Sequence, residues 1–205
     1  MKPIKLIAAV LLLLGALVWV WRGLHPSPPN DVTMPYIGLG QVLAQEAATQ
    51  LHGKEGRVVV VCMPTASEGS QAQLGGLQRA LGQYRNITVT MDALKTDQVG
   101  PMDTISFQQF EALVSQNASA DVIISFLKVA PFTDAQITQL PHPCPKLIVV
   151  RWGQEAVQQG ISAGLVVAAV MERRWISSSA QASNPRQWFD QRYRLITNES
   201  GASLQ

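Results

Sequence analysis

The sequence predicts an α/β fold in which an open, doubly wound and mostly parallel sheet of five strands is flanked by helices on both faces. Five apolar segments rich in β-branched residues have the length of strands, and segments with helical spacing lie between them. Strands joined by helical crossovers run parallel, and right-handed crossovers place helices on both faces of the sheet. We therefore expect the strand order 2-1-3-4-5 in one domain of about 170 residues.

An apolar segment at the N-terminus precedes this domain. Residues 6–21 contain no charged or strongly polar side chain, which predicts a transmembrane helix over residues 1–22 that contacts membrane lipid. Trp19, Trp21 and Arg22 end this segment, and these residue types favour the headgroup level of a bilayer. A cleaved signal peptide remains the alternative, although the small residues that a signal peptidase requires are not visible after the apolar core.

The charges around the apolar segment predict its orientation. Lys2, Lys5 and the amino terminus outnumber Arg22, which favours a cytoplasmic N-terminus and an exported C-terminal domain. Residues 23–35 are rich in proline, and proline favours extended backbone. This stretch is predicted to be a semi-rigid stalk between the membrane and a domain over residues 36–205.

The first half of the domain alternates helix and strand signals. Residues 36–50 carry apolar side chains at helical spacing, and Gly53 follows as a stop signal. Residues 57–62 form a continuous β-branched run, which is typical of a strand covered on both faces. The same criteria predict a helix over residues 71–84 and a second strand over residues 86–91.

Two capping boxes mark the starts of further helices. Ser106 precedes Gln109 by three positions, and Thr133 precedes Gln136 by the same spacing. In this motif each side chain accepts a hydrogen bond from the backbone of the other residue, which satisfies orphan N–H groups at a helix start. Between the two boxes, residues 121–127 read as the third strand.

The last predicted elements follow residue 145. Residues 146–151 form the fourth strand and residues 154–163 a helix. Residues 165–171 are predicted to be the fifth strand, but two alanines in this run leave a buried helical segment as the alternative. From about residue 174 we expect an irregular tail.

The charge of the domain argues against nucleic-acid binding. Without Lys2, Lys5 and Arg22, 13 of the 16 basic residues remain against 14 acidic ones, so the domain is close to neutral. Binding of phosphate backbones requires a basic stripe, which this composition lacks.

Residues that carry out catalysis or bind metal are sparse. The three histidines, His25, His52 and His142, lie apart from any nucleophile motif. His142 and Cys144 supply two potential zinc ligands, whereas a structural zinc site needs four. We expect no enzymatic activity, no cofactor and no metal.

The two cysteines test the predicted strand directions. Cys62 ends the first strand and Cys144 precedes the fourth, so parallel strands place them at opposite ends of the sheet. Their separation of about 20 Å far exceeds the roughly 7 Å limit for a disulfide. The sequence therefore predicts two free and largely buried thiols.

The strand segments carry a resemblance to a known family. The sequences VVVVCMPTASEGSQAQLGGLQRAL, NITVTMD, ADVIISF, KLIVVRW and GLVVAAVMER, together with residues 184–193, resemble one lobe of the type I periplasmic sugar-binding proteins of ABC transporters. This resemblance implies a bacterial protein, with the anchor in the inner membrane and the domain in the periplasm. Ligands of that family lie between two lobes, but only about 30 residues follow the fifth strand here, too few for a second lobe.

The resemblance implies a binding edge at the carboxyl ends of the strands. Ser67 to Ser70 either direct backbone N–H groups toward an anion or form an ordinary helix cap. Trp152 either packs in the core or stacks on a ligand. The candidate contact residues for a ligand or partner at this edge are Thr65, Ser67, Glu68, Asp92, Lys128, Arg151 and Trp152.

Two functions are consistent with these features. The first is a membrane-anchored, non-catalytic accessory or scaffold subunit whose single lobe docks on a larger membrane protein complex. The alternative is a degenerate sugar-binding lobe of a transport or sensing system.

Overall fold

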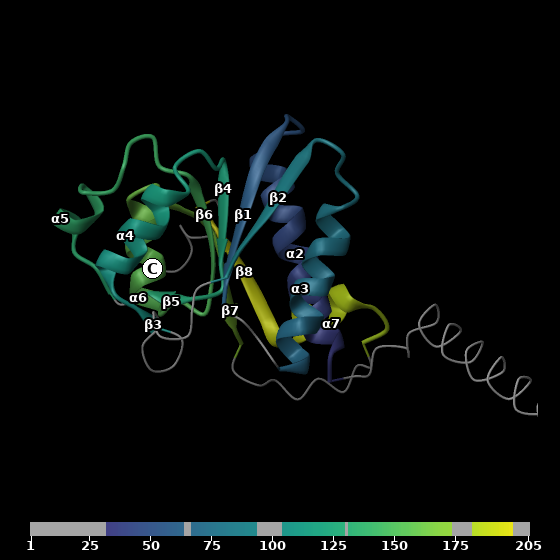
Figure 1. Ribbon diagram of the computed structural model, residues 1–205. Coiled ribbons are helices and arrows are strands. Elements are labelled where there is room, and N and C mark those ends of the chain that lie inside the picture. The colour runs from purple at the N-terminus through teal and green to yellow at the C-terminus, as the bar shows by residue number, and fades with distance from the viewer. Residues whose placement is uncertain (1–31, 64–66, 94–103, 130, 174–181, 199–205) are drawn as a thin grey trace, which may run out of the picture. The chain divides into compact units, whose positions relative to one another are not determined.

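A six-stranded sheet with helices on both faces forms the core of the protein (Figure 1). The computed structural model describes residues 32–63, 67–93, 104–129, 131–173 and 182–198. The predicted transmembrane helix at 1–22, including Trp19, Trp21 and Arg22, lies outside these residues, as does most of the stalk. Within the described ranges, no helix combines the length and the apolar character that crossing a bilayer requires.

The strand order is β2-β1-β4-β6-β7-β8. The first five strands in this order are parallel and reproduce the predicted order 2-1-3-4-5, whereas β8 runs antiparallel to β7. The strands are β1 (Gly56–Cys62), β2 (Ile87–Ala93), β4 (Val122–Ser125), β6 (Lys146–Val150), β7 (Val166–Glu172) and β8 (Tyr193–Thr197).

Alternate residues of the central strands face two separate hydrophobic layers. Val58 and Val60 of β1 contact the layer beneath helices α2, α3 and α7, and Val59 and Val61 contact the layer beneath α4 and α6. The helices are α2 (Met34–Gln50), α3 (Glu68–Leu81), α4 (Phe107–Gln116), α5 (Asp134–Ile137), α6 (Gln154–Ser162) and α7 (Pro185–Arg192). The sheet is therefore doubly wound, as predicted.

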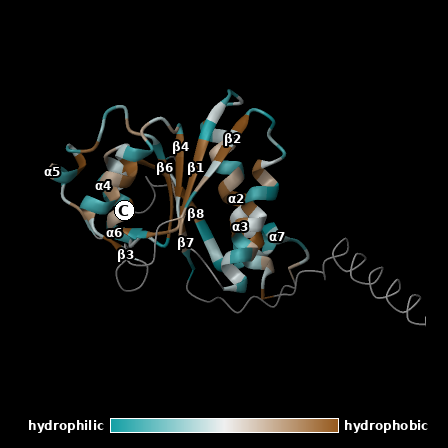
Figure 2. Ribbon diagram, viewed as in Figure 1, coloured by the Kyte–Doolittle hydropathy of each residue, from teal (hydrophilic) through white to brown (hydrophobic). Residues whose placement is uncertain are grey.

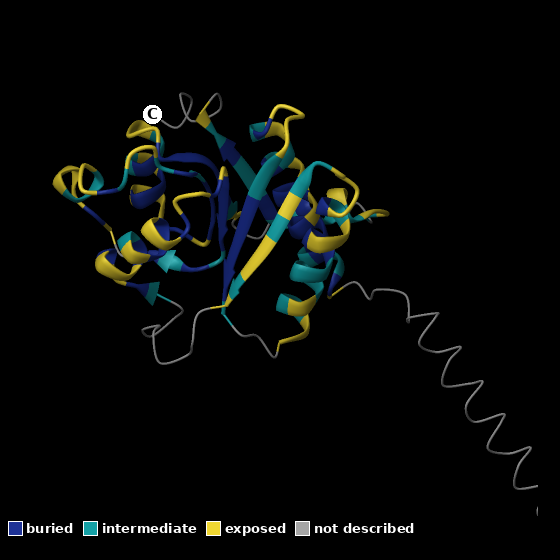
Figure 3. Cartoon of the chain, turned by 45° about the horizontal axis from the view of Figure 1, so that its top comes forward, coloured by how far each residue is buried: buried dark blue, intermediate teal, exposed yellow. Residues whose placement is uncertain are grey.

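The central strands are covered on both faces, and the edge strand β2 is not. Every residue of β4 is buried, as are Val58 to Cys62 of β1, and Figure 2 shows these strands as the most apolar part of the molecule. Along β2 no residue is fully buried, and Met91 is 37% exposed (Figure 3). The continuous valine run thus marks a central strand, as expected.

Both predicted capping boxes are present. The Ser106 hydroxyl accepts from the Gln109 backbone N–H at 3.3 Å, and the Gln109 side chain accepts from the Ser106 N–H at 2.8 Å. Thr133 and Gln136 make the same reciprocal pair at the start of α5. The segment at 165–171 is a strand, so the helical alternative for it was wrong.

The prediction of an irregular tail from residue 174 was wrong for residues 185–197. This segment forms α7 and then β8, which adds a sixth strand beside β7. Burial of Phe189, Tyr193 and Ile196 against the sheet stabilises both elements. A second sheet, also not predicted, pairs β3 (Thr104–Ile105) with β5 (Lys128–Val129).

Helix α2 packs tightly between α3 and α7. A Cβ atom added at Gly40 would collide with the backbone carbonyl of Gln73 in α3, and one added at Gly38 would collide with the carbonyl of Pro185 in α7. A Cβ atom at Gly76 would lie 2.7 Å from the Ile37 carbonyl oxygen. Glycine at these positions allows the helix backbones to approach within contact distance.

Candidate functional site

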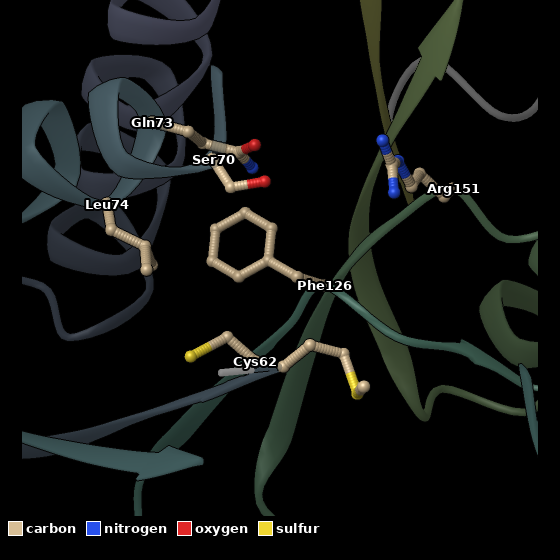
Figure 4. Close-up of a pocket in the computed structure, with 7 residues that line it drawn as sticks. Cys62, Ser70, Gln73, Leu74, Phe126 and Arg151 are labelled. Carbon is tan, nitrogen blue, oxygen red and sulfur yellow. The ribbon is translucent and has the colours of Figure 1, made fainter. Parts of the chain in front are cut away.

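A small pocket lies at the edge of the sheet where β1, β4 and β6 end (Figure 4). Its volume is about 60 Å³. Figure 4 shows the Phe126 ring between Ser70 and Gln73 on one side and the Arg151 guanidinium on the other. The lining residues are Cys62, Met63, Ser70, Gln73, Leu74, Phe126 and Arg151. This is the edge at which open α/β sheets bind ligands.

The N-terminal half of α3 supplies one wall of the pocket. Ser67 caps the helix, since its hydroxyl oxygen accepts from the Ser70 backbone N–H at 3.2 Å. The Ser67 hydroxyl also donates to Ser70 Oγ at 2.8 Å, so the Ser70 proton can donate into the pocket. Ser70, Gln73 and Leu74 are three and four positions apart, a spacing that places them on one helix face.

The opposite wall is Arg151, which holds an unusual backbone conformation. Its φ angle is +67°, in the left-handed region that residues with a Cβ atom seldom adopt. Arg151 directly follows β6 and directly precedes Trp152, whose side chain is only 3% exposed. The backbone must turn sharply here to bury the indole while the arginine remains at the surface.

Trp152 belongs to a buried aromatic cluster. Its indole N–H donates to the Leu127 carbonyl at 3.0 Å. The rings of Phe110 and Phe132 meet it edge-on, each with a centroid distance of 5.7 Å. The structure therefore shows Trp152 as a packing residue, and its ring presents almost no surface to a ligand.

Gln73 brings an unsatisfied donor to the pocket. Its Nε2 atom is shielded from solvent and has no hydrogen-bond partner among the described residues. A buried amide without a partner costs about 1–3 kcal/mol, a cost that an acceptor in the pocket would remove. Sequence reasoning missed Gln73, since its position depends on how α3 sits against the sheet.

Charged side chains of both signs act on Tyr193, the first residue of β8. Burial raises the pKa of Tyr193 to about 12, while the nearby guanidinium groups of Arg192 and Arg151 act to lower the pKa, and Tyr36 and Glu172 add to the rise. Arg192 also stacks on the Tyr36 ring at 5.1 Å. Arg192 also lies over the Tyr193 ring at 5.7 Å.

The other predicted contact residues are dispersed. Glu68 is the exposed first residue of α3 and does not line the pocket. Asp92 lies within β2 rather than after it and accepts a hydrogen bond from the Asn117 side chain at 3.0 Å. Lys128 lies in the short strand β5, and Thr65 falls outside the described residues. Of the six candidates that the structure describes, Arg151 alone lines the pocket.

The thiols are not poised for nucleophilic chemistry. Burial raises the pKa of Cys62, with a further rise from the Asp92 carboxylate, and burial raises the pKa of Cys144 to about 11. Both cysteines are free, as predicted, although Cys144 is only half-buried. Across the described ranges, no three His, Cys, Asp or Glu side chains come together in a way that could hold a metal ion.

The pocket is too small to enclose a sugar. Sites that enclose a small molecule usually have volumes of roughly 300–1,000 Å³. The 60 Å³ measured here accommodates only a few heavy atoms. In this structure a bound sugar would keep most of its surface in solvent.

The fold is similar to that of solved sugar-binding proteins. One is a solute-binding protein of an ABC transporter from Burkholderia graminis in complex with D-arabinose, with a TM-score of 0.55, 12% identity, and coverage of 82% of this chain and 61% of that chain. AraP, an arabinose-binding protein from Geobacillus stearothermophilus, matches with a TM-score of 0.55 and 13% identity, over 83% of this chain and 63% of that chain. A chain of the XylFII–LytSN complex matches with a TM-score of 0.55 and 13% identity, over 80% of this chain and 60% of that chain.

These similarities confirm the predicted resemblance at the level of the fold. The chain covers less than two thirds of the length of each of these proteins. No family model and no curated protein matches the sequence.

Proposed function

We propose that this chain is a non-catalytic solute-binding lobe that uses the pocket between α3 and Arg151 to hold part of a small polar solute. The observation that carries the proposal is the coincidence of this pocket with the carboxyl-end edge of a sheet whose fold is shared with sugar-binding proteins. An aromatic ring flanked by a few polar groups is typical of small-molecule sites.

The small volume indicates that the site is completed by a second wall. The pocket presents one open side, and the chain spans about three fifths of the length of the sugar-binding proteins that share its fold. A second copy of this chain, or another protein, would close over the solute at the same edge. Affinity for a sugar in the isolated chain is therefore expected to be weak.

A docking function is the second candidate. In this hypothesis residues 1–22 anchor the chain in a bacterial inner membrane, the periplasmic domain stands on its stalk, and the open edge contacts a larger membrane protein. The exposed edge supports this role, and one neighbour of similar fold was solved as part of the XylFII–LytSN complex. The two functions are compatible if the docked protein supplies the missing wall.

The solute-binding function is tested by thermal unfolding of the full-length chain in mild detergent, with a panel of neutral pentoses and hexoses and of their acidic derivatives. A ligand at one hundred times its Kd stabilises the folded state by about 2.7 kcal/mol, which shifts the midpoint by several degrees. No shift with any solute, in the absence or presence of co-purified proteins, would refute solute binding.

The docking function is tested by site-specific photo-crosslinking in cells. A crosslinker at Glu68, near the pocket edge, is expected to capture a partner, whereas one at Arg85, in the turn before β2 at the opposite end of the sheet, is not. Equal capture at both positions would indicate that the edge is not the docking surface.

A further inference from the structure

Among the described residues, the pocket at the edge of β1, β4 and β6 is lined by hydrogen-bond donors and by no carboxylate. Its polar side chains are the Arg151 guanidinium, the Ser70 hydroxyl and the Gln73 amide, and the other lining residues are apolar or thiol-bearing. We propose that this pocket binds the oxyanion of an acidic solute, a phosphate or carboxylate group, rather than a neutral sugar. The inference rests on the solute-binding function proposed above and names the class of solute.

All three donors belong to residues that line the same small volume. The Ser70 oxygen accepts from Ser67, which leaves the Ser70 proton available to donate. The Gln73 Nε2 donor is shielded from solvent without a partner in the described structure, and an anionic oxygen would satisfy it. Arg151 approaches from the opposite side across the Phe126 ring (Figure 4). Guanidinium groups bind carboxylate and phosphate with paired, charge-assisted hydrogen bonds.

The size of the pocket agrees with an oxyanion. A volume of about 60 Å³ leaves room for a carboxylate or phosphate group and lies far below the roughly 300–1,000 Å³ of sites that enclose a whole small molecule. The rest of the solute would extend through the open side of the pocket. The acidic group would thus be the anchored end of the molecule.

Charges of both signs lie around this edge of the sheet. The first turn of α3 adds the positive end of a fourteen-residue helix, and the Arg192 guanidinium lies over the Tyr193 ring at 5.7 Å. Three carboxylates oppose this field: Glu68 at the start of α3, Glu172 near Tyr193, and Asp92 near Cys62. None of them lines the pocket, and Asp92 accepts a hydrogen bond from Asn117 of the α4 layer.

The strain at Arg151 gives a variant that separates binding from folding. Asparagine adopts the left-handed conformation more readily than arginine, so Arg151→Asn removes the cation without adding backbone strain. Gln73→Leu removes the unpartnered amide with little change in volume, and its stability is expected to be retained or increased. Arg85→Gln makes the same charge change as Arg151→Asn at the opposite end of the sheet and serves as the control.

The experiment measures binding of glucose 6-phosphate, glucuronate, inorganic phosphate and glucose to the full-length chain in mild detergent by titration calorimetry. We expect the two acidic sugars to bind at least tenfold more tightly than glucose, and inorganic phosphate to compete with them. Arg151→Asn and Gln73→Leu should each weaken acidic-sugar binding about tenfold or more while both variants remain folded at the assay temperature, and Arg85→Gln should retain wild-type affinity.

The outcomes distinguish this inference from the function on which it rests. Glucose or arabinose binding that equals or exceeds acidic-sugar binding, with no effect of Arg151→Asn, would overturn the oxyanion assignment and leave the solute-binding lobe intact. Acidic-sugar binding that Arg85→Gln weakens as much as Arg151→Asn would show a diffuse charge effect and would also overturn it. If none of the four probes and no neutral sugar binds, both proposals fail.

Discussion

Trp152 donates its indole N–H to the Leu127 carbonyl at 3.0 Å, and this bond joins the segment that follows β6 to the segment that follows β4. Both segments leave the sheet beside the pocket, since Phe126 and Arg151 are their immediate neighbours in the chain. The bond and its aromatic cluster hold the segments of Phe126 and Arg151 in position relative to one another. The pocket geometry therefore depends on a residue that does not line it.

Replacement of Trp152 by phenylalanine tests this dependence. The substitution leaves the Leu127 carbonyl without its partner and leaves space beside Phe110 and Phe132, so the free energy of unfolding should fall by about 1–3 kcal/mol. Urea denaturation of the full-length chain measures the loss. Trp188→Phe on α7, outside this cluster, should cost much less, and equal losses would contradict the role assigned to Trp152.

Glycines on neighbouring helices provide a matched pair. Gly40→Ala places a Cβ atom against the Gln73 carbonyl and 2.6 Å from the Leu77 backbone nitrogen, so α2 and α3 must separate. We expect a loss of about 1–3 kcal/mol. Gly75→Ala on α3 meets open space and should instead stabilise the protein by about 0.5–1 kcal/mol, because alanine is the better helix former. Thermal unfolding compares the two, and a stabilising Gly40→Ala would contradict the close packing.

The left-handed backbone at Arg151 predicts that a glycine variant is more stable than an alanine variant at this position. In ordinary backbone conformations alanine is more stabilising than glycine, but at a φ of +67° alanine is strained. Arg151→Gly should therefore be more stable than Arg151→Ala by about 1 kcal/mol. Both variants lose the same side-chain interactions, so the comparison isolates the backbone. The opposite order in urea denaturation would show that the left-handed turn is absent.

Tyr193 predicts a loss of stability in alkali. Its pKa is raised to about 12 in the folded protein from an ordinary value of 10, so the unfolded chain loses this proton first. The contribution of Tyr193 to the free energy of unfolding is therefore fully present below pH 10 and is lost as the pH rises from 10 to 12. The unfolding midpoint followed through this range should fall more steeply in the wild type than in Tyr193→Phe. Parallel curves would contradict the burial of the phenol.

Both cysteines are expected to react slowly with thiol reagents. Burial raises the pKa values of Cys62 and Cys144, and the thiolate is the reactive form, so both should react slowly with a disulfide reagent at pH 8. Denaturant should expose two thiols per chain without reductant. One internal disulfide, detected as two missing thiols, would contradict the parallel arrangement of β1 and β6.

The strands and the helix starts could be predicted from the sequence because each signal is local, and the strand order then follows from right-handed crossovers between parallel strands. Four consecutive valines identify a central strand, and the Ser106–Gln109 spacing identifies a cap. Helix α7 also carried a local signal, because Asn184 and Pro185 are favoured at the cap and first positions of a helix. Strand β8 had no such signal, since five residues directly after a helix become a strand only through pairing with β7.

The candidate site was less predictable because it depends on tertiary packing. Arg151 could be identified from its position after a strand, but the same rule selected Trp152, which packs inward, and Lys128, which joins a short second sheet. Ser70 and Gln73 enter the pocket through the placement of α3, which close glycine contacts with α2 determine. The spacing of residues along the sequence does not predict how α3 packs against α2.

The position of α2 has a practical consequence for protein production. This helix begins at Met34, only two residues after the first described position, and buries nine of its residues between its neighbouring helices and the sheet. A shortened fragment that starts near residue 32 would keep the helix whole, whereas one that starts at residue 51 would leave the apolar groove between α3 and α7 open to water and prone to aggregation. Recombinant fragments for crystallography should therefore begin ahead of Thr33.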